Sequence, residues 1–343
     1  MEASHRNNFD FLRFVAAVLV WYGHCYTLGA LPDPMTRFVP FGTFADLGVA
    51  VFCVISGYFV TRSYEINERL LPFIRNRALR ILPALVVVIL LTVFVIGPVS
   101  TKLSPHAYFV SPLTFDYLHN LLIFPVREHL PDVFKDNASD VVNGSLWVLP
   151  HGVRFYGVIA LLGVLGILQP RLLGVILLGL FAVRIYGAVM HLHSKQVFFG
   201  HAWSEWEVIV RLASEFAAGA FLYLARERVP PSLGGFAIAA VVAGVSIYLP
   251  YPAVGYVLFD MTIAYCIICF GFMRLPLLHG FGGWGDFSYG FYLYAFVMQQ
   301  FFLHLLGNDA DFRMFQLASF CATFLCAVLS WHLVEKRALA LKT

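Results

Sequence analysis

Charged residues are scarce in this chain. Only 13% of its 343 residues are Asp, Glu, Lys or Arg, whereas an ordinary soluble domain carries about 25%. Hydrophobic residues make up 60% of the sequence, and the mean hydropathy is +0.77. These values exclude an ordinary soluble domain. They indicate an integral membrane protein, because several apolar runs reach the roughly 20 residues that a helix needs to cross a bilayer.

Cysteine is also uncommon, and the net charge is a modest +3. All six cysteines lie in apolar segments and none lies in a long loop, so we expect reduced thiols that serve as small packing residues. The Cys-x-x-Cys pair has no further ligands beside it, and we expect no metal site. We also expect no nucleic-acid partner. The six cysteines are Cys25, Cys53, Cys266, Cys269, Cys321 and Cys326.

The apolar runs predict an all-α integral membrane protein with ten transmembrane helices. With a cytoplasmic N-terminus, 13 of the 23 lysines and arginines lie inside (among them Arg6), 6 lie outside (among them Lys195) and 4 lie within spans. This bias follows the positive-inside rule and places both termini in the cytoplasm. The predicted spans are 9–29, 44–62, 81–98, 151–168, 172–192, 207–225, 233–249, 253–273, 286–306 and 314–334.

The longest segment between predicted spans covers residues 99–150 and falls on the outer face. It carries five acidic residues together with aromatic residues, and it is too long for a simple connection. We therefore predict a single membrane domain over residues 1–343 with an extracytoplasmic loop that forms a small cap or an acceptor platform. The five acidic residues are Asp116, Glu128, Asp132, Asp136 and Asp140.

The first apolar run, FDFLRFVAAVLVWYGHCYTLGA (residues 9–30), contains Arg13 and His24. Ionisable side chains inside a membrane span are costly and are functional candidates by default. At 100° and 1.5 Å per residue, the two lie on nearly the same helix face, about 16 Å apart along the axis. A cation near one surface and an imidazole deeper in the membrane suggest a long substrate with an anionic head. A desolvated His24 would suit a general base acting on a hydroxyl, although a buried histidine can also be purely structural.

Two further segments carry candidate binding residues. In RNRALRILPAL (residues 75–85), Arg77 and Arg80 are three residues apart and share a helix face. They can anchor the helix at the headgroups or clamp phosphate groups, since guanidinium groups match phosphate oxygens. In NGSLWVLPHGVRFYG (residues 143–157), polar and aromatic side chains at a span entrance suit a sugar acceptor, or simply the interfacial belt. These candidates for substrate binding are Asn143, Ser145, Trp147, His151 and Arg154.

Other ionisable residues inside predicted spans divide by their spacing. Arg211 and Glu215 are four residues apart on one helix, so we expect them to neutralise each other. Arg184 and Asp260 have no partner nearby in the sequence, and each needs one from another helix.

The chain resembles the bacterial-type integral-membrane acyltransferase family known as acyltransferase family three. The resemblance covers nearly the whole chain and rests on the order and spacing of six segments. These are FDFLRFVAAVLVWYGH (9–24) with its Arg-x10-His pattern, GVAVFCVISGYF (48–59), RNRALRILPA (75–84), NGSLWVLP (143–150), DFSYGFYLYAF (286–296) and SWHLVEKRAL (330–339).

The resemblance implies transfer of an acyl group, often acetyl, from cytoplasmic acyl-CoA to a hydroxyl of an extracytoplasmic or lipid-linked carbohydrate, at the bacterial inner membrane. It implies that His24 is catalytic and that Arg13, Arg77 and Arg80 bind the donor. Two positions depart from the family pattern: Gly152 replaces a common glutamate, and Arg337 replaces a common proline. Because Gly152 has no carboxylate, it puts in doubt any carboxylate role at that position.

Two other classes of function fit the same sequence. Ten spans with intramembrane charges also suit a transporter or flippase for glycans or small solutes. A non-catalytic relative that binds acyl-CoA is the other alternative. The sequence does not choose between direct transfer, with His24 as base, and an acyl-histidine route. It also does not identify the acyl group, the acceptor or the oligomeric state.

Overall fold

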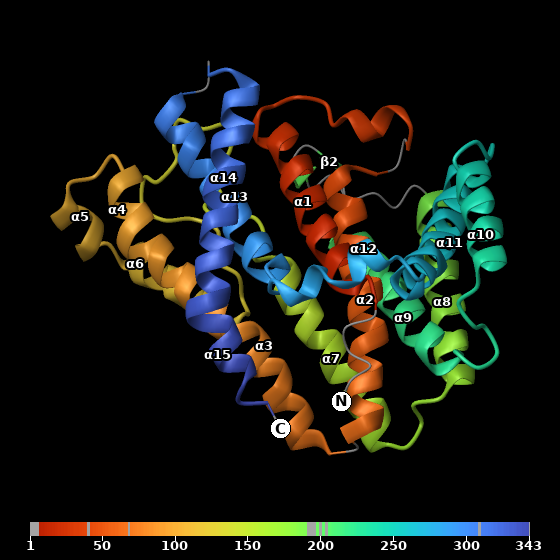
Figure 1. Cartoon of the computed structure of the whole chain (residues 1–343). Helices are drawn as coiled ribbons and strands as arrows, with labels where there is room; N and C mark the ends of the chain where they lie inside the picture. The colour runs from red at the N-terminus through yellow and green to blue at the C-terminus, as the bar shows by residue number, and fades with distance from the viewer. Residues whose placement is uncertain are drawn as a thin grey trace. The chain divides into compact units, whose positions relative to one another are not determined.

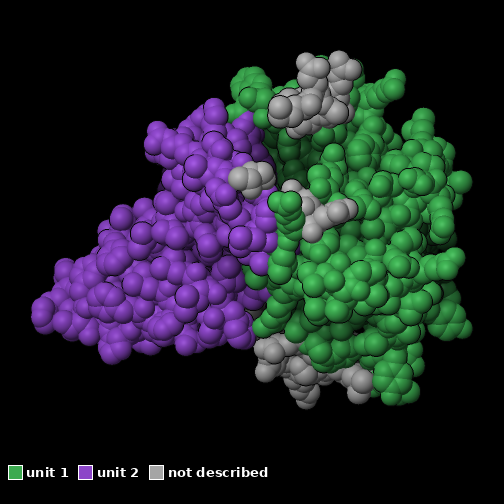
Figure 2. Space-filling model, turned by 90° about the horizontal axis from the view of Figure 1, so that it is seen from below, with its two compact units in different colours: residues 1–16, 34–70, 151–284 green, residues 17–33, 71–150, 285–343 purple. Residues whose placement is uncertain are grey.

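The computed structural model describes residues 7–39, 42–67, 69–190, 197–198, 201–202, 205–307 and 310–342. Within these residues the chain is helical, apart from turns and one antiparallel pair of two-residue strands (Figure 1). The chain divides into two compact units, and each unit is assembled from three separate stretches of sequence (Figure 2). Arg6 and Lys195, which enter the charge count, lie outside the described residues.

Unit 1 comprises residues 1–16, 34–70 and 151–284. Its central packing joins α2 and α9, which approach closely because two glycines meet the opposite backbone. A Cβ atom on Gly57 would lie 2.0 Å from the carbonyl oxygen of Phe216, and one on Gly219 would lie 2.0 Å from that of Val54. Small residues permit such close crossings between membrane helices. The elements are the start of α1 (Phe9–Leu28), a 3-10 turn (Pro34–Arg37), α2 (Phe44–Asn67), most of α7 (Val148–Val164), α8 (Pro170–Val189), β1 (Val197–Phe198), β2 (His201–Ala202), α9 (Glu205–Leu224), α10 (Leu233–Ser246), α11 (Pro252–Phe272), α12 (Pro276–His279) and a 3-10 turn (Phe281–Gly283).

Unit 2 comprises residues 17–33, 71–150 and 285–343. Its core is the pair α13 and α14, which pack against each other, and Asp311 caps the start of α14. The elements are the rest of α1, α3 (Leu70–Leu91), a π-helical turn (Thr92–Ile96), α4 (Gly97–Ser100), α5 (Pro105–Val110), α6 (Pro112–Asp116), a 3-10 helix (Tyr117–Leu122), α13 (Ser288–Leu306), α14 (Phe312–Ser330), a second π-helical turn (Trp331–Glu335) and α15 (Lys336–Leu339).

Residues 99–150 form a folded part of unit 2 rather than a loose loop. Tyr108, Tyr117 and Phe134 are fully buried within it, and the Tyr108 hydroxyl donates to the carbonyl oxygen of Val93 at 2.9 Å. Burial raises the pKa of both tyrosines. On the surface, the hydrogen bond from Lys135 lowers the pKa of Asp140. The segment is therefore an ordered part of unit 2, with buried residues that contact the π-helical turn and α13.

Every predicted span overlaps a helix within the described residues. Among the described residues, six helices are long and apolar enough to cross a membrane: Phe9–Leu28, Phe44–Ile66, Leu70–Ser100, Pro170–Val189, Pro252–Phe272 and Phe312–Leu339. Val148–Val164 and Leu233–Ser246 are apolar but shorter. The prediction of an all-α, multi-pass membrane protein is confirmed. The count of ten crossings and the cytoplasmic termini stay predictions.

Two ion pairs inside unit 1 join different helices. Arg184 donates to Asp260 at 2.6 Å, which confirms that each needs a partner from another helix. Arg211 forms an ion pair of 2.7 Å with Asp46 on α2, a partner that the sequence did not indicate. The expected attraction between Arg211 and Glu215 on α9 is also present. All six cysteines are free thiols, and four of them, Cys25, Cys53, Cys266 and Cys269, are buried.

Candidate active site

The helix α13 is the centre of the candidate site in unit 2. It is buried on all sides, with an unbroken run of buried residues from Gly290 to Gln300. A helix that is apolar around its whole circumference belongs in the interior of a protein or membrane. Successive turns of α13 contact the segments that contain Arg80, His24 and Asn143, three of the predicted site residues.

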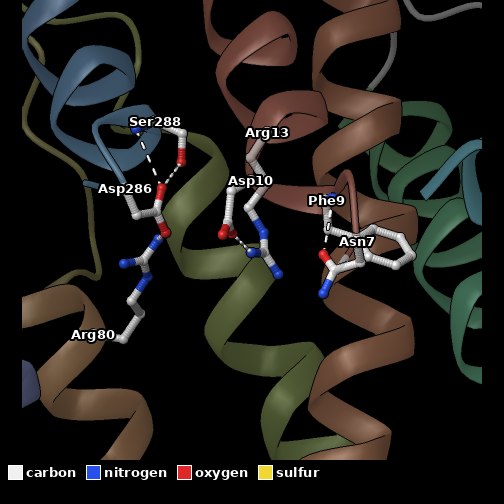
Figure 3. A network of polar contacts seen from close by, with 7 residues as sticks. All are labelled: Asn7, Phe9, Asp10, Arg13, Arg80, Asp286 and Ser288. Carbon is white, nitrogen blue, oxygen red and sulfur yellow. Dashed lines mark hydrogen bonds and ion pairs between the residues drawn. The ribbon is translucent and has the colours of Figure 1, made fainter. Parts of the chain in front are cut away.

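The first turn of α13 holds Arg80. The guanidinium of Arg80 on α3 donates to Asp286 at 2.5 Å and lies over the ring of Tyr289, 5.8 Å from its centroid. Asp286 also accepts a hydrogen bond of 2.5 Å from the Ser288 hydroxyl (Figure 3). The Tyr289 hydroxyl donates to the carbonyl oxygen of Ile81 at 3.0 Å, so it fixes α3 directly beside the arginine. The Arg80 side chain is 22% exposed, so it is held firmly and still reachable.

A second carboxylate acts on the same arginine. Glu335 lies near Arg80 and is 3% exposed. One of its oxygens accepts from the Ser330 hydroxyl at 2.8 Å, and the other, Oε2, has no hydrogen-bond partner. Arg77 is half-buried, three residues before Arg80 on α3. An anion that binds Arg80 would therefore share it with Asp286 and Glu335.

The third turn of α13 contacts His24. The imidazole is buried, with 8% exposure, and packs edge-on against Phe296, with ring centroids 5.1 Å apart. One turn further along α13, the side-chain amide of Gln299 donates to the carbonyl oxygen of Trp21 at 2.7 Å and to the sulfur of Cys25 at 3.0 Å. These contacts fix the backbone of α1 on both sides of His24. Tyr289 and Phe296 are seven residues apart, or about 10 Å along the helix axis.

The middle of α13 binds the segment that precedes α7. The Asn143 amide donates to the carbonyl oxygen of Leu293 at 2.9 Å, and the Tyr292 hydroxyl donates to the carbonyl oxygen of Ser145 at 2.8 Å. Asn143 and Ser145 are buried, and Trp147 is half-buried. The hydroxyl oxygen of Ser145 has no hydrogen-bond partner.

The other predicted site residues belong to unit 1. Arg13 forms an ion pair of 2.9 Å with Asp10 (Figure 3). Its guanidinium lies 5.1 Å from the ring centroid of Phe59. His151 is half-buried and Arg154 is exposed, both on α7. A Cβ atom on Gly152 would meet nothing within 4 Å, so the position that lacks the common glutamate has open space around it.

The sequence reasoning missed the residues of α13 that hold the site together. The segment DFSYGFYLYAF was noted only as part of the resemblance, so Asp286, Tyr289 and Phe296 had no assigned role. One signal was available. Gln299 and Gln300 are adjacent amides inside a predicted span, and polar side chains in such a position need partners.

Comparison with known proteins defines the class. Residues 6–332 match the family described as acyltransferase domain. The chain belongs to this acyltransferase family, whose members require an acyl donor. It is 30% identical over 353 aligned residues to the O-acetyl transferase of Shigella phage Sf6, which covers 97% of this chain and 96% of that protein. It is also 32% identical to Nodulation protein 10 of Rhizobium leguminosarum bv. viciae, over 45% of this chain and 43% of that protein. No solved structure matches the chain.

Proposed function

We propose that this protein moves an acyl group, most simply acetyl, from cytoplasmic acyl-CoA to a hydroxyl of an extracytoplasmic or lipid-linked carbohydrate at the bacterial inner membrane. The observation that carries the proposal is that α13 holds Arg80 at one turn and His24 about two turns further along. This arrangement suits a donor with an anionic end and a long arm that ends in a reactive thioester. The similarity to a protein named O-acetyl transferase supports acetyl as the group and a hydroxyl as the acceptor.

The donor would be held by arginines. Arg80 and Arg77 lie on one face of α3, and their guanidinium groups would bind the phosphates of the nucleotide end. The resemblance to the family is the ground for proposing Arg13 as a further donor ligand. Asp286 keeps the guanidinium of Arg80 in place before the donor arrives. A preorganised cation loses less conformational entropy when it binds an anion than a mobile side chain does.

The chemistry would be carried by His24. Its imidazole would accept the proton of the acceptor hydroxyl while that oxygen attacks the thioester carbonyl. The carbon–sulfur bond then breaks, and the proton passes to the departing thiolate, so the histidine returns to its neutral form. Burial of His24 against Phe296 excludes water that would otherwise hydrolyse the thioester.

The acceptor would bind at the segment that leads into α7. Trp147 is half-buried and offers an aromatic face for a sugar ring, and Asn143, Ser145, His151 and Arg154 supply polar groups along the same stretch. The hydrogen bonds from Asn143 and Tyr292 fix this stretch to α13, the helix that also contacts His24.

Transfer from labelled acetyl-CoA into membrane glycan tests the proposal. The unmodified chain should incorporate label, and His24→Ala should lower the rate by about 10²-fold or more, which is the usual contribution of a general base. Glu227→Gln changes an exposed acid on the turn after α9 and should leave the rate unchanged. Full activity of folded His24→Ala would remove His24 from the chemistry. Transport of unmodified glycan into vesicles without acyl-CoA would instead favour the transporter.

A further inference from the structure

A cluster of five ionisable side chains lies inside unit 1, and none of the five has a role in the proposed reaction. Four helices contribute to it: α2, α8, α9 and α11. Its two ion pairs join Arg211 to Asp46 at 2.7 Å and Arg184 to Asp260 at 2.6 Å. The fifth member is Glu215, one turn after Arg211 on α9. Asp46 accepts two further hydrogen bonds from Thr43, through the backbone amide at 3.0 Å and the hydroxyl at 2.7 Å.

The charges of this cluster do not balance. Three carboxyl groups face two guanidinium groups, which leaves one negative charge in excess when all five are ionised. Asp46 and Asp260 each form an ion pair with an arginine, and the charges of Arg211, Arg184, Asp260 and Asp46 all act on Glu215. The excess charge is assigned to Glu215, whose remaining neighbours are the thiol of Cys53 on α2 and, across a small cavity, the phenol of Tyr256 on α11. An unbalanced carboxylate inside a membrane protein is costly, and neutralisation removes that cost.

Glu215 also has unused hydrogen-bonding capacity. The residue is 3% exposed, and its oxygen Oε2 has no hydrogen-bond partner. A buried carboxylate normally uses both oxygens as acceptors, whereas a carboxylic acid has an O–H to donate. The Nη1 atom of Arg184 is likewise buried without a partner.

A small cavity meets the cluster at this point. Its volume is about 20 Å³, which is room for one water molecule. Asp46, Arg211, Glu215, Tyr256 and Asp260 line its polar wall. Residues of the segment before α2 line the opposite side, among them Met35, Val39 and Thr43.

We propose that this cavity is a proton-binding site. Glu215 holds an exchangeable proton there, and its O–H donates a hydrogen bond to a water molecule that also contacts the neighbouring ion pairs. The proton balances the cluster, and the water occupies the cavity and satisfies the remaining polar atoms. A sodium ion suits the site less well, because the two nearest carboxylates are already bound to arginines and the two guanidinium groups repel a fixed cation. Buried acids of this kind bind protons in membrane proteins.

Infrared spectroscopy of the purified, full-length protein tests the site. At neutral pH the protein should show the carbonyl stretch of a protonated carboxylic acid, and the band should disappear at alkaline pH. Glu215→Gln should remove the part of the acid band that Glu215 contributes, and Glu227→Gln, which changes an exposed acid, should keep the full band. An acid band of full intensity in folded Glu215→Gln overturns the proposal. The proposal is also overturned if the unmodified protein shows no acid band and its melting temperature rises when sodium is added.

A second experiment decides the matter if Glu215→Gln does not fold. Glu335 is the other buried glutamate with an unpartnered oxygen among the described residues, and it could give a similar band. The variant Glu335→Gln is therefore prepared with ¹³C-labelled glutamate. An acid band that persists and shifts with the label supports Glu215 as the proton carrier. The absence of a labelled acid band overturns it.

Discussion

At the scale of single residues, Arg80 illustrates how the site is prepared. An arginine keeps its charge at any physiological pH, so a partly buried guanidinium must be paired. Asp286 provides that pair at 2.5 Å and is itself fixed by the Ser288 hydroxyl. The same carboxylate could compete with a donor phosphate or orient the guanidinium toward it. Its second bond to Ser288, at the start of the rigid helix α13, favours orientation.

We therefore expect Asp286→Asn to weaken acyl-CoA binding by about tenfold, because a charge-assisted hydrogen bond contributes about 1.5–3 kcal/mol. Arg80→Ala should weaken binding further, and both variants should bind the carbohydrate acceptor normally. Titration of each purified variant with acyl-CoA measures the effect. Tighter binding by Asp286→Asn would mean that the carboxylate shields Arg80 instead of orienting it.

The sequence predicted this arginine but not its surroundings. Helical spacing put Arg77 and Arg80 on one face, and the positive-inside rule placed them at a membrane surface. Asp286 is 206 residues away in the chain, so no local pattern connects it to Arg80. The same limit explains Arg211. Its neighbour Glu215 was visible in the sequence, whereas its ion-pair partner Asp46 lies on another helix.

At the scale of helices, the contact between α2 and α9 depends on two glycines. An added Cβ would lie 2.0 Å from an opposing carbonyl oxygen at both Gly57 and Gly219, and a backbone atom cannot move aside as a side chain can. We expect Gly57→Ala and Gly219→Ala each to destabilise the protein by about 1–3 kcal/mol through overpacking. Thermal unfolding in detergent measures the loss.

Gly179→Ala is the matched control for this pair. Gly179 lies within α8, and an added Cβ there would meet nothing within 4 Å. Because alanine favours a helix over glycine by about 0.5–1 kcal/mol in soluble hosts, this variant should unfold at the same temperature or a higher one. Equal destabilisation of all three variants would show that glycine matters for flexibility, not for the close approach of α2 and α9.

Hydropathy predicted where the helices lie but not where each one begins and ends. The predicted span 81–98 corresponds to a helix that starts at Leu70, because the polar segment RNRALR that precedes the apolar run is also helical. The segment 99–150 was predicted to be a platform on account of its length alone. Its internal structure depends on distant contacts, such as those of Gln300 with the carbonyl oxygens of Ser139 and Val141, and these contacts leave no local signature.

At the scale of the whole molecule, the number of membrane crossings decides which segments face the donor and which face the acceptor. Ten crossings with a cytoplasmic N-terminus place residues 274–285 inside. If only the six longest apolar helices cross, the same segment lies outside. Leu277 belongs to this segment and is 97% exposed, so a cysteine at this position reports its side of the membrane.

We expect Leu277→Cys to resist a membrane-impermeant thiol reagent applied to intact cells and to react once the membrane is opened. Asp136→Cys should react in intact cells and Glu227→Cys should not. Ten crossings and six crossings both place Asp136 outside the membrane and Glu227 inside, and both residues are exposed. The unmodified chain gives the background from its six native thiols. Labelling of Leu277→Cys in intact cells would contradict ten crossings. It would also put the turn just before Asp286, and with it the Arg80 end of α13, on the side away from cytoplasmic acyl-CoA.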